Sequence, residues 1–558
     1  MSLASSVCAS LDFMFCMPRL VVIVAIVASA PPIMFTQSRN ASTSTGPQVA
    51  QRADTLVAEG AAALERGDAQ GAKKLFRRAL MLDARSVAAH TYLGLIADHA
   101  GELAEAERQF AEAARVAPAS PEARNNHGGI LLRLGRKPAA IKEFEASLRL
   151  DPKQAGALIN LAQIRFAADT PESMRTARSL FQRAEAIAPD AEVARSLIVI
   201  SLRLHEPRSA AEEFTRYQEK LHAAPPASKT PSARAELGTA LLEAGLSGEA
   251  AIELEAAVAA EPSNADRVVL LARAYREQKN LSDAGRTLEA AIARELQSAP
   301  LYAALAEVYE DSGHAEKAIP AMRQAIQLEP RSEKYRFRYA MLLTDTQAPQ
   351  AAVIRLQEAL KEFPQSPRLW FAMGIAQFQD NKYDDATKAF ARAVELDAHM
   401  LPALLYQGMV RVDQGNVPNA LPYYRRALAL DDRSAIGHYL IAQAFSKLSP
   451  PDEQEAESHL KRALLLDPGF QQARLELGKL YVRNNRFAEA AAELEAVIKA
   501  DPKVAEAYYQ LGRAYVRLKK KDEGQATMAK FEALSKEEKE QSENQRRDIV
   551  RRLADVRF

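Results

Sequence analysis

Residues 87–120 read VAAHTYLGLIADHAGELAEAERQFAEAARVAPAS, and the spacing of small, large and helix-breaking residues in this stretch decides the fold. The frame consists of a large apolar residue followed by a small one, then Ala, a large residue, a small residue and Pro: Leu93-Gly94, Ala106, Phe110, Ala113 and Pro118. It returns as Leu237-Gly238, Ala250, Leu254, Ala257 and Pro262, and as Leu477-Gly478, Ala490, Leu494, Val497 and Pro502. The interval of 34 residues between units along almost the whole chain indicates a repeat architecture.

The register contains fourteen units and covers about residues 53–538. The eighth position is Gly or Ala in thirteen units, with Ile198 as the exception, and the twentieth is Ala in thirteen, with Gly524 in the last. Chance does not produce such agreement. The units are predicted to start near Ala53, Val87, Pro121, Ala155, Glu192, Pro231, Ala265, Ala299, Glu333, Pro367, Leu401, Ala435, Gln471 and Ala505.

Each unit holds two segments whose apolar residues recur with helical spacing, joined by a turn that often contains Gly, as at Gly101 and Gly245. The small residues mark where two helices approach too closely for a larger side chain. Pro at the unit end, as at Pro118, stops the second helix because its ring cannot continue the hydrogen-bond ladder. One helix pair cannot bury its own apolar stripe, so the units must stack on one another.

This pattern resembles the tetratricopeptide repeat in both spacing and residue type. The resemblance implies an all-α fold, a right-handed superhelical solenoid of stacked helix-turn-helix repeats. It also implies a binding role, because in this family the first helix of each pair lines the concave face, mainly through positions 2, 5, 9, 12 and 13. No unit carries the Lys and Asn pair at positions 5 and 9 with which some members clamp a terminal carboxylate.

The concave positions change character along the array, from apolar in units nine to twelve to basic in units thirteen and fourteen. An exposed apolar strip usually marks a binding site, and basic side chains can hold carboxylates. Alternatively, the apolar side chains are buried against the next unit and the basic ones are solvated. The predicted partner-binding residues are Phe337, Met341, Phe371, Ile375, Phe378, Leu405, Met409, Tyr439, Lys479, Arg483, Arg513 and Arg517.

The strip in unit ten is expected to be independent of the core. Phe371, Ile375 and Phe378 share one helical face. Core packing is already provided by Met373, Gly374, Ala386 and Phe390. We therefore expect Phe371→Ala and Met409→Ala to weaken partner binding while leaving the melting temperature nearly unchanged.

Departures from the register predict where the array is interrupted. The fifth unit has Tyr217 where a small residue belongs, and the Pro- and Ala-rich residues 222–230 that follow are typical of a linker. We therefore predict about five repeats over 53–221, the main articulation at 222–230, and about nine repeats over 231–538.

Smaller irregularities affect individual units. The fourth unit has about three extra residues in its inter-helix turn, and the twelfth has about two around Pro450-Pro451. Pro320 and Pro422 fall inside the expected second helices of their units. Those helices either start late or bend at the proline.

The two ends of the chain differ from the repeats. An uncharged run, Leu20–Ala30, follows Arg19 and ends in Ala28-Ser29-Ala30, the small-x-small form of a signal-peptidase site. Residues 1–35 are either a cleaved signal peptide or, over about 13–35, an N-terminal anchor; a cytosolic chain with a misassigned start is the third alternative. The first two predict an exported (periplasmic or secreted) or membrane-anchored protein. The polar residues 36–52 predict a disordered spacer, and the charged residues 539–558 a C-terminal capping helix.

Composition narrows the function. A formal net charge of +1 and a sequence pI near 7.7 provide no global field for nucleic acid or an anionic membrane. The only cysteines, Cys8 and Cys16, precede the repeats, and no phosphate-loop, dinucleotide, zinc-protease or serine-hydrolase motif occurs. We therefore expect no catalytic residue, no cofactor and no metal.

The sequence favours a non-catalytic scaffold that binds a protein or peptide partner outside the cytoplasm. One alternative is an accessory subunit of an envelope polysaccharide-export or glycosyl-transfer assembly whose enzyme is another chain. The other is an architectural spacer. Scaffold and accessory subunit both predict a stoichiometric protein partner, and the spacer does not.

Overall fold

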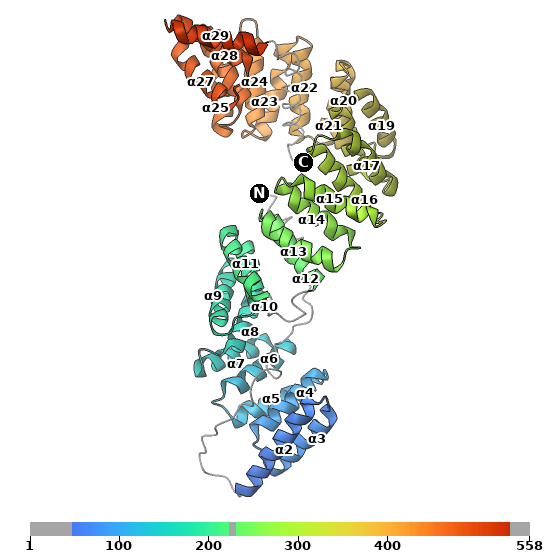
Figure 1. Cartoon of the computed structure of the whole chain (residues 1–558), viewed down its shortest axis with the longest axis vertical. Coiled ribbons are helices and arrows are strands. Elements are labelled where there is room, and N and C mark those ends of the chain that lie inside the picture. The colour runs from blue at the N-terminus through green and yellow to red at the C-terminus, as the bar shows by residue number, and fades with distance from the viewer. Residues whose placement is uncertain (1–46, 222–229, 536–558) are drawn as a thin grey trace. The chain divides into compact units, whose positions relative to one another are not determined.

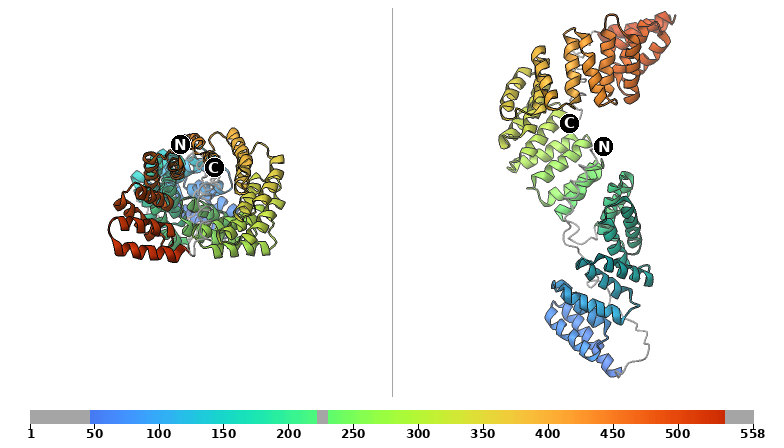
Figure 2. Two further views of the ribbon diagram at one scale, coloured as in Figure 1. Left: turned by 90° about the horizontal axis from the view of Figure 1, so that it is seen from above. Right: turned by 180° about the vertical axis from the view of Figure 1, so that it is seen from behind.

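The computed structural model describes residues 47–221 and 230–535, and within these ranges it contains 28 α-helices, one 3-10 turn and no strand (Figure 1). Consecutive helices form antiparallel pairs joined by short turns, as the views in Figure 2 also show. Contacts divide the chain into two compact units, Met1–Thr287 and Leu288–Phe558, with the boundary inside α15. The all-α stack of helix pairs predicted from the sequence is confirmed.

The first compact unit holds the helices up to the start of α15: α2 (Pro47–Glu65), α3 (Ala69–Leu82), α4 (Val87–His99), α5 (Leu103–Val116), α6 (Pro121–Arg133), α7 (Lys137–Leu150), α8 (Ala155–Phe166), α9 (Pro171–Ile187), α10 (Ala191–Arg203), α11 (Pro207–Leu221), α12 (Pro231–Glu243), α13 (Ser247–Ala260), α14 (Ala265–Glu277) and α15 (Leu281–Ala293).

The second compact unit continues with α16 (Ala299–Asp311), α17 (Ala315–Leu328), α18 (Glu333–Asp345), α19 (Pro349–Glu362), α20 (Pro367–Gln379), α21 (Tyr383–Leu396), α22 (Leu401–Asp413), η2 (Val417–Asn419), α23 (Leu421–Leu430), α24 (Ala435–Lys447), α25 (Glu453–Leu466), α26 (Gln471–Arg483), α27 (Phe487–Ala500), α28 (Ala505–Arg517) and α29 (Lys521–Ser535).

The first helix begins at the predicted residue in twelve of the fourteen repeats. The exceptions are α10, which begins one residue early at Ala191, and α2, which begins at Pro47 instead of near Ala53. Residues 47–52 therefore belong to the first helix, and their assignment to a disordered spacer was wrong.

Close approach of the paired helices explains the small residue at the eighth position. A Cβ atom added to Gly408 would lie 2.3 Å from Cε1 of Tyr424, the aromatic residue at the facing position of the second helix. The turns explain the other recurring glycine, because Gly101 adopts a φ of 77°, a conformation that side chains disfavour.

The predicted irregularities have different structural outcomes. In the fourth repeat α9 has 17 residues against 14 in α5, so most of the extra residues lengthen the second helix, and the prediction of a longer turn was largely wrong. In the twelfth repeat residues 448–452 separate α24 from α25, which confirms the longer turn around Pro450-Pro451.

The two prolines predicted to lie inside second helices have different positions in the structure. Pro320 lies inside α17, which continues through it. In the eleventh repeat a 3-10 turn precedes α23, which starts late, with Pro422 as its second residue. The predicted late start therefore occurs at Pro422, whereas α17 begins at its usual repeat position and includes Pro320.

The hydrophobic core continues from the fifth repeat into the sixth. Tyr217 and Leu221 of α11 belong to the same buried cluster as Leu237 and Leu241 of α12. Residues 222–229 themselves lie outside the described part of the chain, as do 1–46 and 536–558. The articulation, the leader and the C-terminal capping helix therefore stay predictions.

Candidate functional site

The apolar residues predicted to form an exposed strip are mostly buried. Phe371, Ile375 and Leu405 have 0% of their surface exposed. The others are scarcely more accessible: Tyr439 3%, Phe337 7%, Met341 7% and Phe378 8%. Met409 alone in this set is half-buried. The expectation of an exposed apolar strip was therefore wrong.

Contacts with neighbouring helices account for this burial. The ring of Phe371 lies 5.8 Å from that of Phe390 in α21 and 5.6 Å from that of Tyr406 in α22. Phe371 thus packs against the second helix of its own repeat and the first helix of the next. The expectation that these side chains are unnecessary for stacking was also wrong.

The predicted basic residues remain accessible and three of them come together. Arg483, Arg513 and Arg517 are exposed, whereas Lys479 is half-buried and ion-paired with Glu476 at 2.8 Å. The three arginines line a pocket of about 490 Å³, called here the C-terminal pocket. Its lining consists of Val482, Arg483, Asn485, Phe487, Gly512, Arg513, Val516, Arg517 and Met528.

The repeat geometry positions these arginines. Arg513 and Arg517 are one helical turn apart on α28 and share a face. Arg483 is the last residue of α26 and occupies the same repeat position as Arg517, one unit earlier. Because α26 and α28 contact each other, the three arginines line the same pocket.

The electrostatics of the C-terminal pocket favour an anion. No Asp or Glu is among its lining residues. Arg483 lies 4.0 Å from Glu453, Arg513 donates to Gln510 Oε1 at 3.1 Å, and Arg517 forms no hydrogen bond or ion pair within the described part of the chain. Arginines near a helix C-terminus also interact favourably with the helix dipole, and this interaction alone is a sufficient reason for basic residues at these positions. Their convergence on one pocket adds the capacity to bind a carboxylate or phosphate.

The lining of the C-terminal pocket also contains apolar side chains. Val516 is 60% exposed, and Phe487 and Met528 are half-buried. The pocket can therefore accommodate an acidic group with an apolar side chain next to it. Sequence reasoning missed these three residues. Val516 occupies position 12, a concave position that could have identified it, whereas Phe487 and Met528 come from second helices and carry no such signal.

Two searches of the described residues complete the description of possible sites. Over 47–221 and 230–535, no three His, Cys, Asp or Glu side chains cluster in a way that could hold a metal ion. In the same ranges no helix has the length and apolar character needed to cross a membrane.

Comparison with protein families gives matches along the repeats. Two models, both described as tetratricopeptide repeat, match the chain. One matches residues 57–123, 100–155, 125–192, 303–367, 345–400, 371–435, 405–469, 452–492 and 475–527, and the other matches residues 231–308.

Two curated relatives are similar over short segments. The E3 SUMO-protein ligase RanBP2 of Drosophila melanogaster is 31% identical over 109 residues, which are 17% of this chain and 4% of that protein. Protein bimA of Emericella nidulans is 29% identical over 102 residues, which are 18% of this chain and 12% of that protein. The chain thus spans only a small part of the length of either relative.

Solved structures resemble the chain over most of its length at low identity. The Cut9 and Hcn1 hetero-tetramer of the APC/C covers 84% of this chain and 97% of its own, at 14% identity and a TM-score of 0.38. Yeast Tom70 covers 82% and 98%, at 16% identity and a TM-score of 0.38.

Proposed function

Because the chain belongs to the tetratricopeptide repeat family, we propose that it is a non-catalytic scaffold that binds an acidic segment of a protein partner in the C-terminal pocket. Repeats of this family serve generally as protein-interaction scaffolds, and the fold of this chain fits that role. The position and chemistry of the binding site are our inference from the described residues.

One observation carries the proposal: three exposed arginines, Arg483, Arg513 and Arg517, line one pocket that has no Asp or Glu among its lining residues. A partner carboxylate would replace water around these groups and form charge-assisted hydrogen bonds. The exposed Val516 beside them would cover an apolar side chain of the same segment. The buried residues around Phe371 provide no comparable surface.

Selection of peptides tests this assignment. A random peptide library displayed on phage is selected on the purified chain, and we expect the enriched peptides to combine Asp or Glu with a large apolar residue. The double variant Arg513→Glu with Arg517→Glu should bind them at least about ten-fold more weakly, since about 1.4 kcal/mol corresponds to a factor of ten. Binding should also weaken with salt.

Arg355→Glu is the matched control, because Arg355 lies on the second helix α19 with 51% of its side chain exposed. It reverses the same charge away from the pocket and should leave peptide binding unchanged. Enrichment of peptides without acidic residues, or equal loss of binding in control and double variant, would refute the assignment of the site.

Location outside the cytoplasm is a second part of the proposal, supported by the apolar run Leu20–Ala30 and its small-x-small end. We expect intact-mass measurement on protein from the native host to place the mature N-terminus between Pro31 and Asn40. Retention of Leu20–Ala30 would rule out cleavage and favour an anchor.

A further inference from the structure

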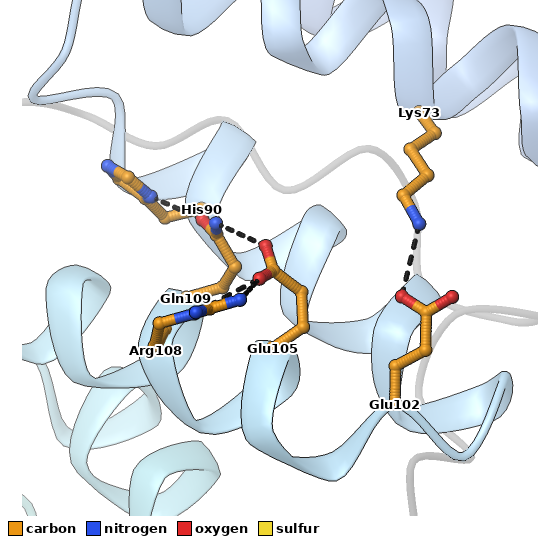
Figure 3. A network of polar contacts seen from close by, with 6 residues as sticks. All are labelled: Lys73, His90, Glu102, Glu105, Arg108 and Gln109. Carbon is orange, nitrogen blue, oxygen red and sulfur yellow. Dashed lines mark hydrogen bonds and ion pairs between the residues drawn. The ribbon is translucent and has the colours of Figure 1, made fainter.

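Some repeats contain a polar contact, called here the clip, between the fourth residue of the first helix and the seventh residue of the second. In the second repeat the clip joins His90 of α4 to Gln109 of α5 (Figure 3), with His90 Nδ1 2.7 Å from Gln109 Oε1. The other ring nitrogen, Nε2, lies 3.2 Å from the carbonyl oxygen of Ala84, just before the repeat. The clip therefore ties together both helices and the preceding turn.

The twelfth repeat has a different pair at the same two positions. Nδ1 of His438 in α24 lies 2.8 Å from Nδ1 of His459 in α25, and Nε2 of His438 lies 3.1 Å from the carbonyl oxygen of Asp432. The ring of His459 also stacks on that of Phe445, with centroids 5.8 Å apart. An imidazole has thus taken the place of the amide found in the second repeat.

The two clips differ in which ring nitrogens can donate a hydrogen bond and which must accept one. His438 Nε2–H donates to Asp432, so its Nδ1 carries a lone pair that accepts a hydrogen bond from His459 Nδ1–H. A first proton added to His438 Nδ1 requires His459 to move its own proton from Nδ1 to Nε2, and a second added proton brings two N–H groups face to face. In the second repeat both nitrogens of His90 face oxygen atoms, so both can donate at once.

The surroundings of the pair contain groups that lower the two histidine pKa values and groups that raise them. Burial lowers the pKa of His459 to about 4, with further lowering by His438 and by Arg425 of α23. Burial also lowers the pKa of His438, with Arg462 of α25 acting in the same direction and the turn residues Asp432 and Asp431 opposing it. Glu455 of α25 lies 3.9 Å from His459 Nε2 and favours the charged ring, but at that distance it does not compensate for burial.

We propose that the His438–His459 pair is a proton-sensitive clip that holds the twelfth repeat closed in neutral solution and lets it open more often in mildly acidic solution. The direction of the pH effect follows from linkage. A histidine whose pKa is lower in the folded than in the unfolded chain contributes its full stability at pH values above the unfolded pKa of 6.5. This contribution is lost as the pH falls from 6.5 toward the folded pKa of about 4. Because repeats contact mainly their neighbours, release loosens the attachment of the thirteenth and fourteenth repeats to the rest of the array.

Hydrogen exchange of the full chain at pH 7.5 and pH 5.0, corrected for the intrinsic exchange rate, tests this inference. We expect opening of α24 and α25 to increase about ten-fold or more at the lower pH, while α4 and α5, with the His90–Gln109 clip, change much less. His459→Gln installs in the twelfth repeat the pair found in the second, and should reduce the difference between the two pH values several-fold, while the burial of His438 leaves a smaller one.

An unchanged acid response in the His459→Gln variant would overturn the proposal, as would equal acid responses of the second and twelfth repeats in the wild type.

If the variant does not fold, histidine ring titration by NMR on the selectively labelled wild-type chain decides. Two rings that do not titrate above pH 5 support the clip, and nine rings that all titrate near 6.5 refute it. The outcome does not depend on whether the C-terminal pocket binds peptides.

Discussion

At the scale of the residue, Phe371 shows how one side chain serves two repeats. Its ring packs against Phe390 within its own helix pair and against Tyr406 in the next first helix. Tyr406 is itself fully buried, and its hydroxyl has no hydrogen-bond partner within the described residues. Aromatic packing therefore fills the buried part of the junction between the tenth and eleventh repeats.

Truncation of Phe371 is expected to be costly. Phe371→Ala removes a fully buried ring and should destabilise the array by about 3–5 kcal/mol, seen as an earlier thermal transition by circular dichroism. Tyr406→Phe is the matched control in the same cluster, because it keeps the ring and removes only the unpaired hydroxyl, and it should be neutral or slightly stabilising. A Phe371→Ala variant that melts like the wild type would contradict this assignment to the core.

At the scale of the element, the distance between paired helices depends on the small residue at the eighth position. Gly408 of α22 faces Tyr424 of α23, which is 1% exposed. The same contact recurs between Gly374 and Phe390, where an added Cβ would lie 2.5 Å from Cδ1. The helix pair is thus fitted to glycine in these repeats.

Gly408→Ala should therefore destabilise its repeat by about 1–3 kcal/mol through overpacking, although alanine favours helix more than glycine does. Gly248→Ala in α13 provides the comparison, since an added Cβ there meets nothing within 4 Å. That substitution should raise stability by about 0.5–1 kcal/mol. Urea unfolding of both variants checks the two signs, and a stabilising effect of Gly408→Ala would disprove the close-contact explanation.

At the scale of the whole molecule, each repeat contacts mainly its neighbours, and one predicted linker lies between the fifth and sixth repeats. The buried cluster shared by Tyr217, Leu221, Leu237 and Leu241 nevertheless joins the repeats on either side of it. Gln218 Nε2 also donates to Glu253 Oε1 at 2.5 Å, from the fifth repeat to the sixth. A cut in the linker therefore leaves these contacts in place.

Limited trypsin digestion should cut first after Lys220 or Lys229, and both fragments should stay helical because each retains several stacked repeats. The nicked chain should elute as one species in gel filtration, because the shared cluster still holds the fragments together. First cuts within the eighth to eleventh repeats would place the articulation elsewhere. Fragments that separate at once would show that the shared cluster is too weak to join them.

The repeat period, the helix starts and the small contact residues could be read from the sequence because they are set within one unit. Helical spacing of apolar residues, a cap or proline at many of the helix starts and a glycine facing an aromatic residue all lie within 34 residues of one another. Twelve exact helix starts follow from such local rules. The three basic residues of the C-terminal pocket were also identifiable, because repeat position determines which face of a first helix they occupy.

Exposure and pairing were decided only by the tertiary structure. Whether Phe371 faces solvent depends on the size of Tyr406 in the next repeat, so its position in its own repeat could not show its burial. The C-terminal pocket combines α28 with Phe487 and Met528 from two second helices, and the clip pairs two histidines from facing helices. These properties arise where separate helices meet, because side-chain volume and proton placement there depend on both partners at once.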